Sequence, residues 1–283
     1  MDLGIVDTHL HLWDPNHLRY PWLDLVPLLN KQYLLPEYRA AHSSVPVEKM
    51  VFVECEADPR HAVDEANWVA SLIPQDPRIE GIVPSAPLEK GEAATDVLDQ
   101  LAEIPQVRGI RRNIQMEPDV AFCLRPDFVK GVQILSRYNY SFDICIGHIN
   151  LANTLGLVRQ CPGVLFILDH IGKPNIKEHV LEPWKSELRE LAALENVFCK
   201  VSGLVVEADL ERWTQKDLKP YLDHVFECFG FDRVMFGGDW PVVLQATELT
   251  EWIETLERAV ADCSDTERRK LFRENAIRFY RLD

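Results

Sequence analysis

The segment Gly4-Ile-Val-Asp-Thr-His-Leu-His-Leu-Trp13 is a short apolar run that ends in polar side chains, which is typical of a buried strand. Seven later runs share this character. Each is rich in Val, Ile and Phe and spans seven to ten residues, the usual length of a strand. They are Lys49–Glu56, Ile79–Leu88, Val107–Gln115, Ser141–Gly147, Val164–Gly172, Val197–Gly203 and Val234–Pro241.

Helical periodicity marks several of the segments between these runs. Apolar residues recur there every three or four positions, as they do on the buried face of an amphipathic helix. Ser264 and Glu267 predict a capping box, in which each side chain satisfies a free backbone N–H at the start of the last helix. The predicted helices are Arg60–Ile73, Pro126 to about Arg137, Asp217–Phe229, Thr247–Ala261 and Arg268–Tyr280.

This alternation of strands and helices predicts a parallel sheet. Eight strand–helix units follow one another in 283 residues with no linker or change of composition between them. They predict an α/β fold of the closed (β/α)8 TIM-barrel type, as a single domain over residues 1–283. A doubly wound sheet is disfavoured because the sequence contains neither GxGxxG nor GxxxxGKS/T.

The chain carries 30 Lys and Arg residues against 45 Asp and Glu residues, a net charge of −15. Such a charge repels phosphate backbones and anionic lipids, so neither nucleic acid nor a membrane is expected as a partner. The longest apolar run, Val164–Leu168, is far shorter than the ~20 residues of a membrane helix. Asp7, His9 and His11 within Met1–Leu12 argue against a targeting segment.

The sequence contains seven cysteines, an odd number, and no CxxC pair. Several of them, such as Cys145 and Cys199, lie inside apolar runs. This usage predicts buried free thiols in a reducing cytosol, and therefore a cytoplasmic protein. A nucleophilic cysteine is the minority alternative, and the sequence leaves the oligomeric state open.

In barrels of this kind the active site lies at the carboxyl ends of the strands. Side chains alternate along a strand, so His9 and His11 share a face at the end of the first one. Two imidazoles in this arrangement can bind one metal ion. The alternative is that they are ordinary polar residues at a strand end.

The second strand carries carboxylates among apolar residues. We expect Val51, Val53 and Cys55 to face the helices, which places Glu54 and Glu56 on the inner face near the rim. Because an unpaired carboxylate in an apolar strand is costly, Glu54 is a candidate substrate ligand. The alternative is an ion pair between Glu54 and an inward-facing arginine.

The fourth strand predicts an unusually polar barrel interior. If Ile110 and Ile114 face the helices, then Arg111, Asn113 and Gln115 point inward. The Arg111 guanidinium is suited to a substrate carboxylate, carbonyl or hydroxyl group. A structural ion pair with the carboxylate of the second strand is the alternative.

Further polar residues follow the later strands. His148 and His170 come at the ends of the fifth and sixth strands, and both are candidate catalytic residues. Lys200 shares an inner face with Ser202, and it needs an anionic neighbour or an anionic substrate there. Asp239 follows two glycines at the end of the eighth strand, where it is placed to take or deliver a proton.

Together these residues resemble the amidohydrolase superfamily. More narrowly, the chain resembles the amidohydrolase-2 branch, which contains the sugar-lactone and 2-pyrone-4,6-dicarboxylate lactonases. The resemblance spans the whole chain. It rests on Asp7-Thr-His-Leu-His11, Tyr20-Pro-Trp22-Leu, Gly109-Ile-Arg111-Arg, Leu168-Asp-His170-Ile-Gly-Lys-Pro174, Lys200-Val-Ser-Gly203 and Gly238-Asp-Trp-Pro241.

The resemblance implies a metal site formed by His9, His11 and Asp239, with His148 and His170 as further catalytic residues. Dinuclear members carry a carboxylated lysine or an acidic bridge on the fourth strand, where this chain has arginines. It therefore implies at most one divalent ion, with zinc as the first choice. A metal-independent reaction stays open, since some lactonases of this branch work without a metal.

The reaction that the resemblance implies is hydrolysis of a lactone, most closely a sugar (aldono) lactone such as a fucono-, rhamnono- or galactono-lactone. Asp239 would take a proton from water and return it to the departing ring oxygen. A bound Zn²⁺ would lower the pKa of that water or polarise the carbonyl group. Contacts to the small-molecule lactone are expected from Trp22, Glu54, Arg111, Gln115 and Lys200.

Two other functions compete with this one. A metal-dependent non-oxidative decarboxylase of the same superfamily would release CO₂ where a lactonase releases a hydroxy acid. A catalytically inactive barrel that only binds a ligand would show no turnover of any lactone.

Overall fold

Eight parallel strands within residues 4–283 form the centre of the molecule, and each of the eight predicted runs overlaps one of them. The computed structural model describes residues 4–283; residues 1–3, part of the segment predicted not to be a targeting peptide, lie outside the described residues. The strands are β1 (Ile5–Leu10), β2 (Val47–Val53), β3 (Ile79–Val83), β4 (Gly109–Arg111), β5 (Ser141–Ile144), β6 (Phe166–Leu168), β7 (Val197–Val201) and β8 (Val234–Phe236).

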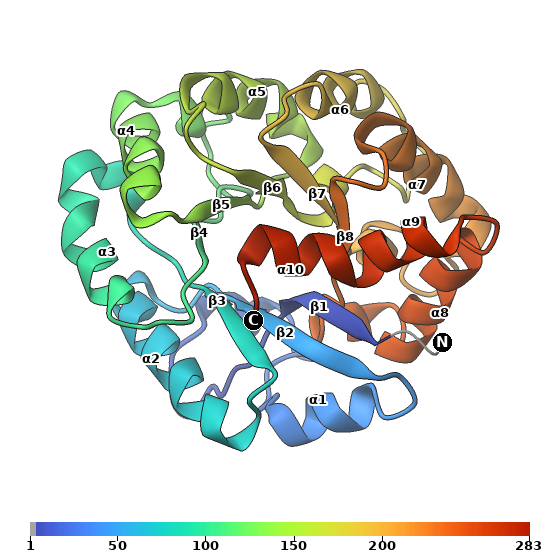
Figure 1. Cartoon of the computed structure of the whole chain (residues 1–283), viewed down its shortest axis with the longest axis horizontal. Coiled ribbons are helices and arrows are strands. Elements are labelled where there is room, and N and C mark those ends of the chain that lie inside the picture. Colours follow the sequence, from blue (N-terminus) through green and yellow to red (C-terminus); the bar gives the residue numbers. More distant parts are fainter. Residues whose placement is uncertain (1–3) are drawn as a thin grey trace.

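The strands close into a ring. Parallel ladders join β1, β2 and β3 in one sheet and β4 to β8 in another. Two isolated parallel bridges connect the sheets: Leu10 pairs with Trp240 just beyond β8, and Ile82 of β3 pairs with Val107 just before β4. The predicted (β/α)8 barrel is therefore confirmed (Figure 1).

A helix follows each strand and lies on the outside of the barrel (Figure 1). The five predicted helices are all present, with ends displaced by a few residues. No helix within residues 4–283 has both the length and the apolar composition needed to cross a membrane. The eight outer helices are α1 (Leu35–Ala41), α2 (Ala62–Leu72), α3 (Thr95–Ala102), α4 (Pro126–Ile134), α5 (Leu151–Gln160), α6 (Trp184–Ala192), α7 (Gln215–Phe229) and α8 (Leu249–Ala259).

The chain ends in a helical segment that crosses one end of the barrel (Figure 1). It consists of α9 (Asp265–Arg269), a π-type turn at Lys270–Glu274 and α10 (Asn275–Tyr280). The Ser264 hydroxyl accepts a hydrogen bond from the Glu267 backbone N–H at 3.3 Å, and the Glu267 carboxylate accepts one from the Ser264 N–H at 2.9 Å. The predicted capping box is thus confirmed.

Two apolar clusters make up the core. The larger one fills the space between the strands and the outer helices. The smaller one lies inside the barrel, where valine, isoleucine and methionine side chains from five strands meet α10, so this part of the interior is a packed core rather than a channel. Its buried members are Val6, Val51, Val53, Val83, Ile167, Met235, Ala276, Phe279, Tyr280 and Leu282.

The predicted orientation of Val51 and Val53 is wrong. Val51 and Val53 pack inside the barrel, whereas Met50 and Phe52 belong to the cluster that faces the helices. Cys55 belongs to that outer cluster, as predicted, and also lines a cavity at the rim. Strands of a closed parallel sheet are buried on both faces, so hydrophobicity does not distinguish the inner face of an all-apolar run from its outer face.

Gly131 of α4 offers a test of the packing between the outer elements. A Cβ atom at this position would lie 2.1 Å from the carbonyl oxygen of Leu88. Alanine normally favours a helix over glycine by about 1 kcal/mol. We expect Gly131→Ala instead to lower the free energy of unfolding in urea by about 1–3 kcal/mol, because the added methyl group overpacks the contact. Gly163→Ala is the control, since the nearest atom to its Cβ lies 4.0 Å away; equal effects would contradict this packing.

Candidate active site

β1 ends in two neighbouring imidazoles. His9 is fully buried and His11 nearly so, and their ring centroids lie 4.8 Å apart. Asp7 orients this end of the strand, because its carboxylate accepts hydrogen bonds from the His9 backbone N–H at 3.0 Å and from the Tyr38 hydroxyl at 2.7 Å. The alternation along β1 thus delivers both histidines to the same part of the rim.

The chain after β8 is fastened to β1 by backbone hydrogen bonds. The Asp239 N–H donates to the His9 carbonyl oxygen at 2.8 Å, and the His11 N–H donates to the Trp240 carbonyl oxygen at 2.9 Å. The start and the end of the barrel are therefore joined at the residues that carry the candidate chemistry.

The two glycines that precede Asp239 permit this close approach. A Cβ atom at Gly237 would lie 2.8 Å from the Cβ of His9, and one at Gly238 would lie 2.4 Å from the Asp7 carboxylate. The Gly238 N–H donates to that same carboxylate at 2.7 Å. Side chains at either position would push β8 away from β1.

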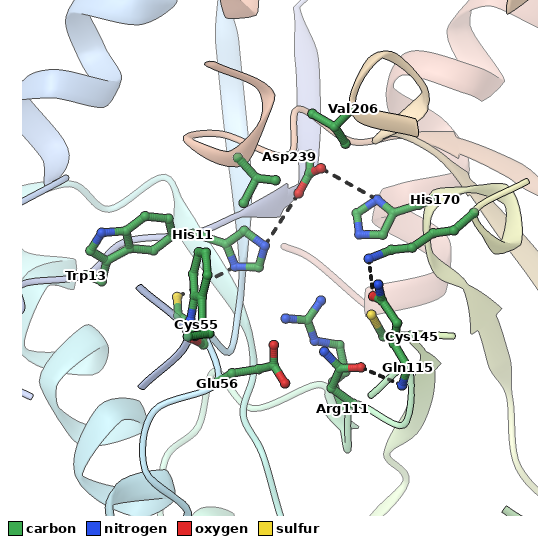
Figure 2. Close-up of a pocket in the computed structure, with 14 residues that line it drawn as sticks. His11, Trp13, Cys55, Glu56, Arg111, Gln115, Cys145, His170, Val206 and Asp239 are labelled. Atoms are coloured by element: carbon green, nitrogen blue, oxygen red, sulfur yellow. Dashed lines mark hydrogen bonds and ion pairs between the residues drawn. The ribbon is translucent and has the colours of Figure 1, made fainter. Parts of the chain in front are cut away.

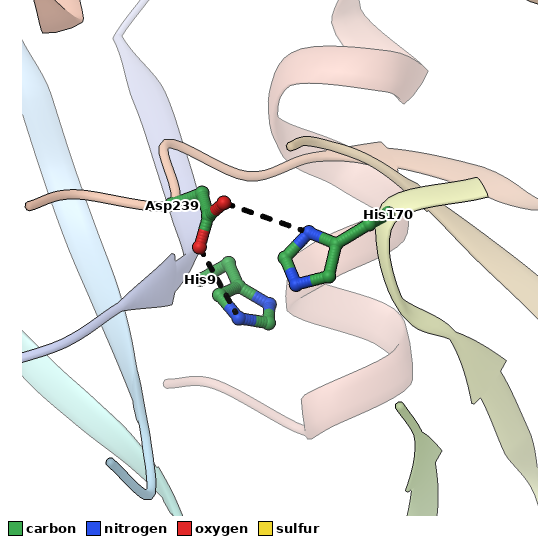
Figure 3. A group of neighbouring side chains, drawn as sticks. All are labelled: His9, His170 and Asp239. Carbon is green, nitrogen blue, oxygen red and sulfur yellow. Dashed lines mark ion pairs between the residues drawn. The ribbon is translucent and has the colours of Figure 1, made fainter. Parts of the chain in front are cut away.

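The Asp239 carboxylate faces three imidazoles, those of His11 and His170 (Figure 2) and that of His9 (Figure 3). Its Oδ1 lies 3.6 Å from His11 Nε2 and 3.8 Å from His9 Nε2, and its Oδ2 lies 3.8 Å from His170 Nδ1. Asp239 and His170 both have positive φ angles, 54° and 53°. Such backbone conformations cost about 1–3 kcal/mol in residues other than glycine, and they gather at functional sites.

The hydrogen bonds of His11 fix its tautomer. Its Nδ1 lies 2.8 Å from the Val53 carbonyl oxygen, which can only accept, so Nδ1 carries the proton. In the neutral ring, Nε2 then presents a lone pair toward the Asp239 carboxylate. Two acceptors that face each other in this way suit a shared proton, a water molecule or a cation.

The other two imidazoles are held in their neutral form. Burial, together with the nearby Lys200 ammonium, keeps the pKa of His9 well below its ordinary value. Burial and the neighbouring His9 do the same to the pKa of His170. Neutral imidazoles can accept a proton or bind a metal ion at neutral pH.

A layer of buried ion pairs lies beside the imidazoles. Arg111 Nε donates to Glu54 at 2.7 Å, and its Nη1 lies 3.4 Å from Asp169. Lys200 Nζ donates to Asp143 at 2.7 Å and lies 3.1 Å from Asp169. Burial alone would raise the pKa of Asp169, but Lys200 and Arg111 hold it below its ordinary value. The charges inside the barrel thus stabilise one another.

A cavity of about 230 Å³ opens above these groups (Figure 2). Its walls combine aromatic and aliphatic side chains with acids, bases and amides, the mixture expected of a site for a small polar molecule. The lining residues are His11, Trp13, Trp22, Cys55, Glu56, Arg111, Asn113, Gln115, Cys145, His170, Lys173, Val206, Asp239 and Val242.

Most of the predicted site residues meet at this cavity. His9 lies directly behind the lining, and the Trp22 indole N–H is anchored to the Cys55 carbonyl oxygen at 2.8 Å. Ile110 and Ile114 belong to the outer cluster, so the predicted orientation of β4 is confirmed. The predicted residues that line the cavity are His11, Trp22, Arg111, Gln115, His170 and Asp239.

Three predicted site residues lie elsewhere. Glu54 borders an adjoining cavity and is paired with Arg111, and this ion pair is the alternative that the sequence left open. Lys200 is completely buried among aspartates, and its position does not support the prediction that it binds substrate. His148 is half-buried outside the cavity, with Nδ1 3.1 Å from the Lys173 carbonyl oxygen, so the structure does not bring it to Asp239.

Sequence reasoning assigned no role to several residues that shape the site. Glu56 and Lys173 line the cavity, and both have positive φ angles, which no spacing pattern reveals. Asp143 and Asp169 supply two of the three carboxylates of the ion-pair layer. An aspartate within the apolar run Ser141–Gly147 was a usable signal, because a buried carboxylate requires a partner.

The cluster of His9, His170 and Asp239 fits one divalent cation (Figure 3). One ligand atom from each residue lies within 4.8 Å of the others, and all three side chains are buried. Two neutral imidazoles and a carboxylate suit zinc, which keeps an open position in catalytic sites. The predicted set contained His11 in place of His170, and His11 remains adjacent through its 3.6 Å approach to Asp239.

The closed barrel carries histidines at its rim and an aspartate, Asp239, just after β8. Together these features define a class of barrel hydrolases. The family model described as Amidohydrolase matches residues 6–282, and the chain belongs to this family. The resemblance inferred from the sequence is thereby confirmed.

Relatives with assigned activities are similar over their full lengths. The chain is 32% identical to the L-fucono-1,5-lactonase of Burkholderia multivorans, covering 98% of this chain and 96% of that protein. It is 25% identical to the L-rhamnono-gamma-lactonase of Scheffersomyces stipitis, covering 98% of each. A crystal structure of an amidohydrolase from Burkholderia multivorans with bound zinc matches with a TM-score of 0.89 at 30% identity, covering 99% of this chain and 100% of that one.

Replacement of Lys200 tests whether the layer of buried ion pairs stabilises the fold. Lys200→Met leaves Asp143 and Asp169 buried without their ammonium partner. We expect the free energy of unfolding in urea to fall by about 3–5 kcal/mol, the usual cost of breaking a buried pair from one side. Lys219→Met removes an exposed i,i+4 pair with Asp223 and should change it by no more than about 0.5 kcal/mol. A small effect at Lys200 would show that the aspartates are not held as ions.

Proposed function

We propose that this protein hydrolyses a lactone, and that the substrate is a sugar lactone such as a fucono-, rhamnono- or galactono-lactone. The observation that carries the proposal is the Asp239 carboxylate, which faces three imidazoles at a small polar cavity. The family and the two lactonases among its relatives support the same reaction. The free thiols of all seven cysteines fit the cytoplasmic setting that we also propose.

Asp239 acts as the general base and then as the general acid. It takes a proton from water while the water oxygen bonds to the lactone carbonyl carbon. The tetrahedral intermediate collapses with cleavage of the bond between that carbon and the ring oxygen. The protonated Asp239 returns its proton to the departing oxygen, which leaves a hydroxy acid and restores the carboxylate.

Arg111 is placed to stabilise the oxyanion. It lines the cavity, and its Nη1 lies 3.3 Å from His9 Nε2. Burial would lower the pKa of Arg111, but the Glu54 carboxylate and other anions raise it well above its ordinary value. The guanidinium is therefore a permanent positive charge held in place before substrate arrives, which is the most effective form of electrostatic catalysis.

The ring of the lactone is covered by Trp22, and its hydroxyl groups contact Gln115. The Trp22 indole is half-buried and anchored at Cys55, so its face is fixed against the cavity. The Gln115 amide accepts a hydrogen bond from Lys173, which leaves its N–H₂ group for the substrate.

We propose zinc as the metal, bound by His9, His170 and Asp239 with His11 adjacent. When bound, it would polarise the carbonyl group and lower the pKa of water. The Arg111 guanidinium approaches the single lone pair of His9 Nε2. A bound metal ion would need the same lone pair, so metal binding competes with the Arg111 contact. This competition keeps a metal-independent reaction, in which Arg111 and the imidazoles stabilise the oxyanion, as the alternative.

Replacement of Asp239 tests its role as the general base in lactone hydrolysis. Asp239→Asn keeps the shape of the side chain but cannot take the proton. We expect kcat for a sugar lactone, followed by acid release, to fall by about 10²- to 10⁴-fold. The urea unfolding midpoint should stay close to that of the parent protein; near-parental turnover by a folded variant would remove Asp239 from the mechanism.

Zinc affinity tests the metal cluster independently of turnover. In calorimetric titrations with ZnCl₂, His170→Asn should bind zinc more weakly by more than about 100-fold, the upper range for losing only a hydrogen-bonded partner of a ligand. His148→Asn should bind zinc like the parent, because His148 lies outside the cluster. Equal losses in both variants would contradict the ligand set, and turnover unaffected by chelator would favour the metal-independent alternative.

The two remaining functions predict different products. A decarboxylase would release CO₂ from an aromatic carboxylate and leave lactones intact. An inactive barrel would turn over neither compound, even with zinc present. Parallel assays of acid release and CO₂ release over a panel of aldonolactones and hydroxybenzoates therefore separate the three functions.

A further inference from the structure

Glu56 is a carboxylate at the cavity that the reaction above does not use. It lies three residues beyond the end of β2 and lines the cavity with a positive φ of 53°. Its backbone N–H donates to the Glu54 carboxylate at 2.6 Å, which holds the turn in this strained conformation. A glutamate in such a conformation persists only where its surroundings impose it.

Glu54 and Glu56 differ in how their charges are satisfied. Glu54 is fully buried and pairs with the Arg111 guanidinium. Among the ion pairs within residues 4–283, none includes Glu56. Burial and the adjacent Glu54 raise the pKa of Glu56, and the nearby Arg111 and Lys173 charges and a hydrogen bond from Asn113 offset this only in part. An ionised carboxylate accepts about four hydrogen bonds, so most of the acceptor capacity of Glu56 faces the cavity unused.

The position of Glu56 indicates which part of a ligand it meets. It lies across the cavity from Asp239 (Figure 2). It also stands where this cavity meets a second one of about 290 Å³, since Trp22, Glu56 and Asn113 border both. A lactone whose carbonyl group is at Asp239 therefore directs its opposite end toward Glu56 and the second cavity.

We propose that Glu56 binds hydroxyl groups at the end of the lactone remote from the carbonyl, and thereby selects polyhydroxylated lactones over unsubstituted ones. The proposal rests on the proposed lactonase function. Two hydroxyl groups on neighbouring carbons can donate to the two oxygens of one carboxylate. A lactone without them leaves most acceptor positions of a partly buried carboxylate unfilled, which is the strongest basis for rejecting a substrate analogue.

Kinetics with two substrates test this role. The full chain and its Glu56→Ala and Glu56→Gln variants are assayed with a fucono- or galactono-lactone and with δ-valerolactone, whose ring carries no hydroxyl groups. Glu56→Ala should lower kcat/KM for the sugar lactone by about 100-fold or more and change that for δ-valerolactone by less than about threefold. Glu56→Gln keeps an acceptor oxygen and should lose less. The exposed Glu251→Gln is the control for loss of a carboxylate.

Binding of a carbonyl-free ring keeps the test independent of turnover. A 1,5-anhydroalditol has the ring and hydroxyl groups of a sugar lactone but nothing to hydrolyse. It should bind the parent protein at least tenfold more tightly than the Glu56→Ala variant in calorimetric titrations. Equal affinities, or equal loss of kcat/KM for both lactones, would overturn the role of Glu56. Absence of turnover with this difference in affinity intact would overturn the lactonase function alone.

Discussion

The site depends on the seam where the end of the barrel returns to its beginning. Backbone hydrogen bonds from Asp239 to His9 and from His11 to Trp240 close the ring and, in the same step, bring the carboxylate to the imidazoles. The chain can approach this closely only because Gly237 and its neighbour carry no side chains. Closure of the fold and assembly of the site are therefore one event, and a change in the seam alters both.

The charges inside the barrel explain the properties of the groups above them. Lys200 and Arg111 pair with three buried carboxylates, so the interior is polar but each charged group of this layer has a partner of opposite charge. These same cations, together with burial, keep His9 neutral. A buried ion pair stabilises a fold little compared with apolar packing, and its use in some proteins is to fix orientation. Here Arg111 belongs both to this layer and to the cavity wall, and so couples the two.

Much of the architecture is predictable because apolar runs of strand length alternate with amphipathic segments. The residues at the ends of those runs also identify the rim, including Asp239. How deeply a side chain is buried, and in which direction it points, are harder to predict from the sequence. The sequence predicts the wrong face for Val51 and Val53 because both faces of β2 are apolar. His148 and His170 both end strands, and only the left-handed turn at His170 directs one of them to the cavity. Such turns depend on tertiary contacts, which residue spacing does not record.

The most direct measurement is a crystal structure of the Asp239→Asn protein with a sugar lactone bound. It should place the carbonyl carbon of the lactone within about 3.5 Å of a water molecule held by residue 239, the distance at which bond formation begins. The hydroxyl groups at the other end of the ring should contact Glu56. A lactone bound outside this cavity, or one with its carbonyl group turned away from residue 239, would contradict the central claim that the seam between β1 and β8 forms the active site.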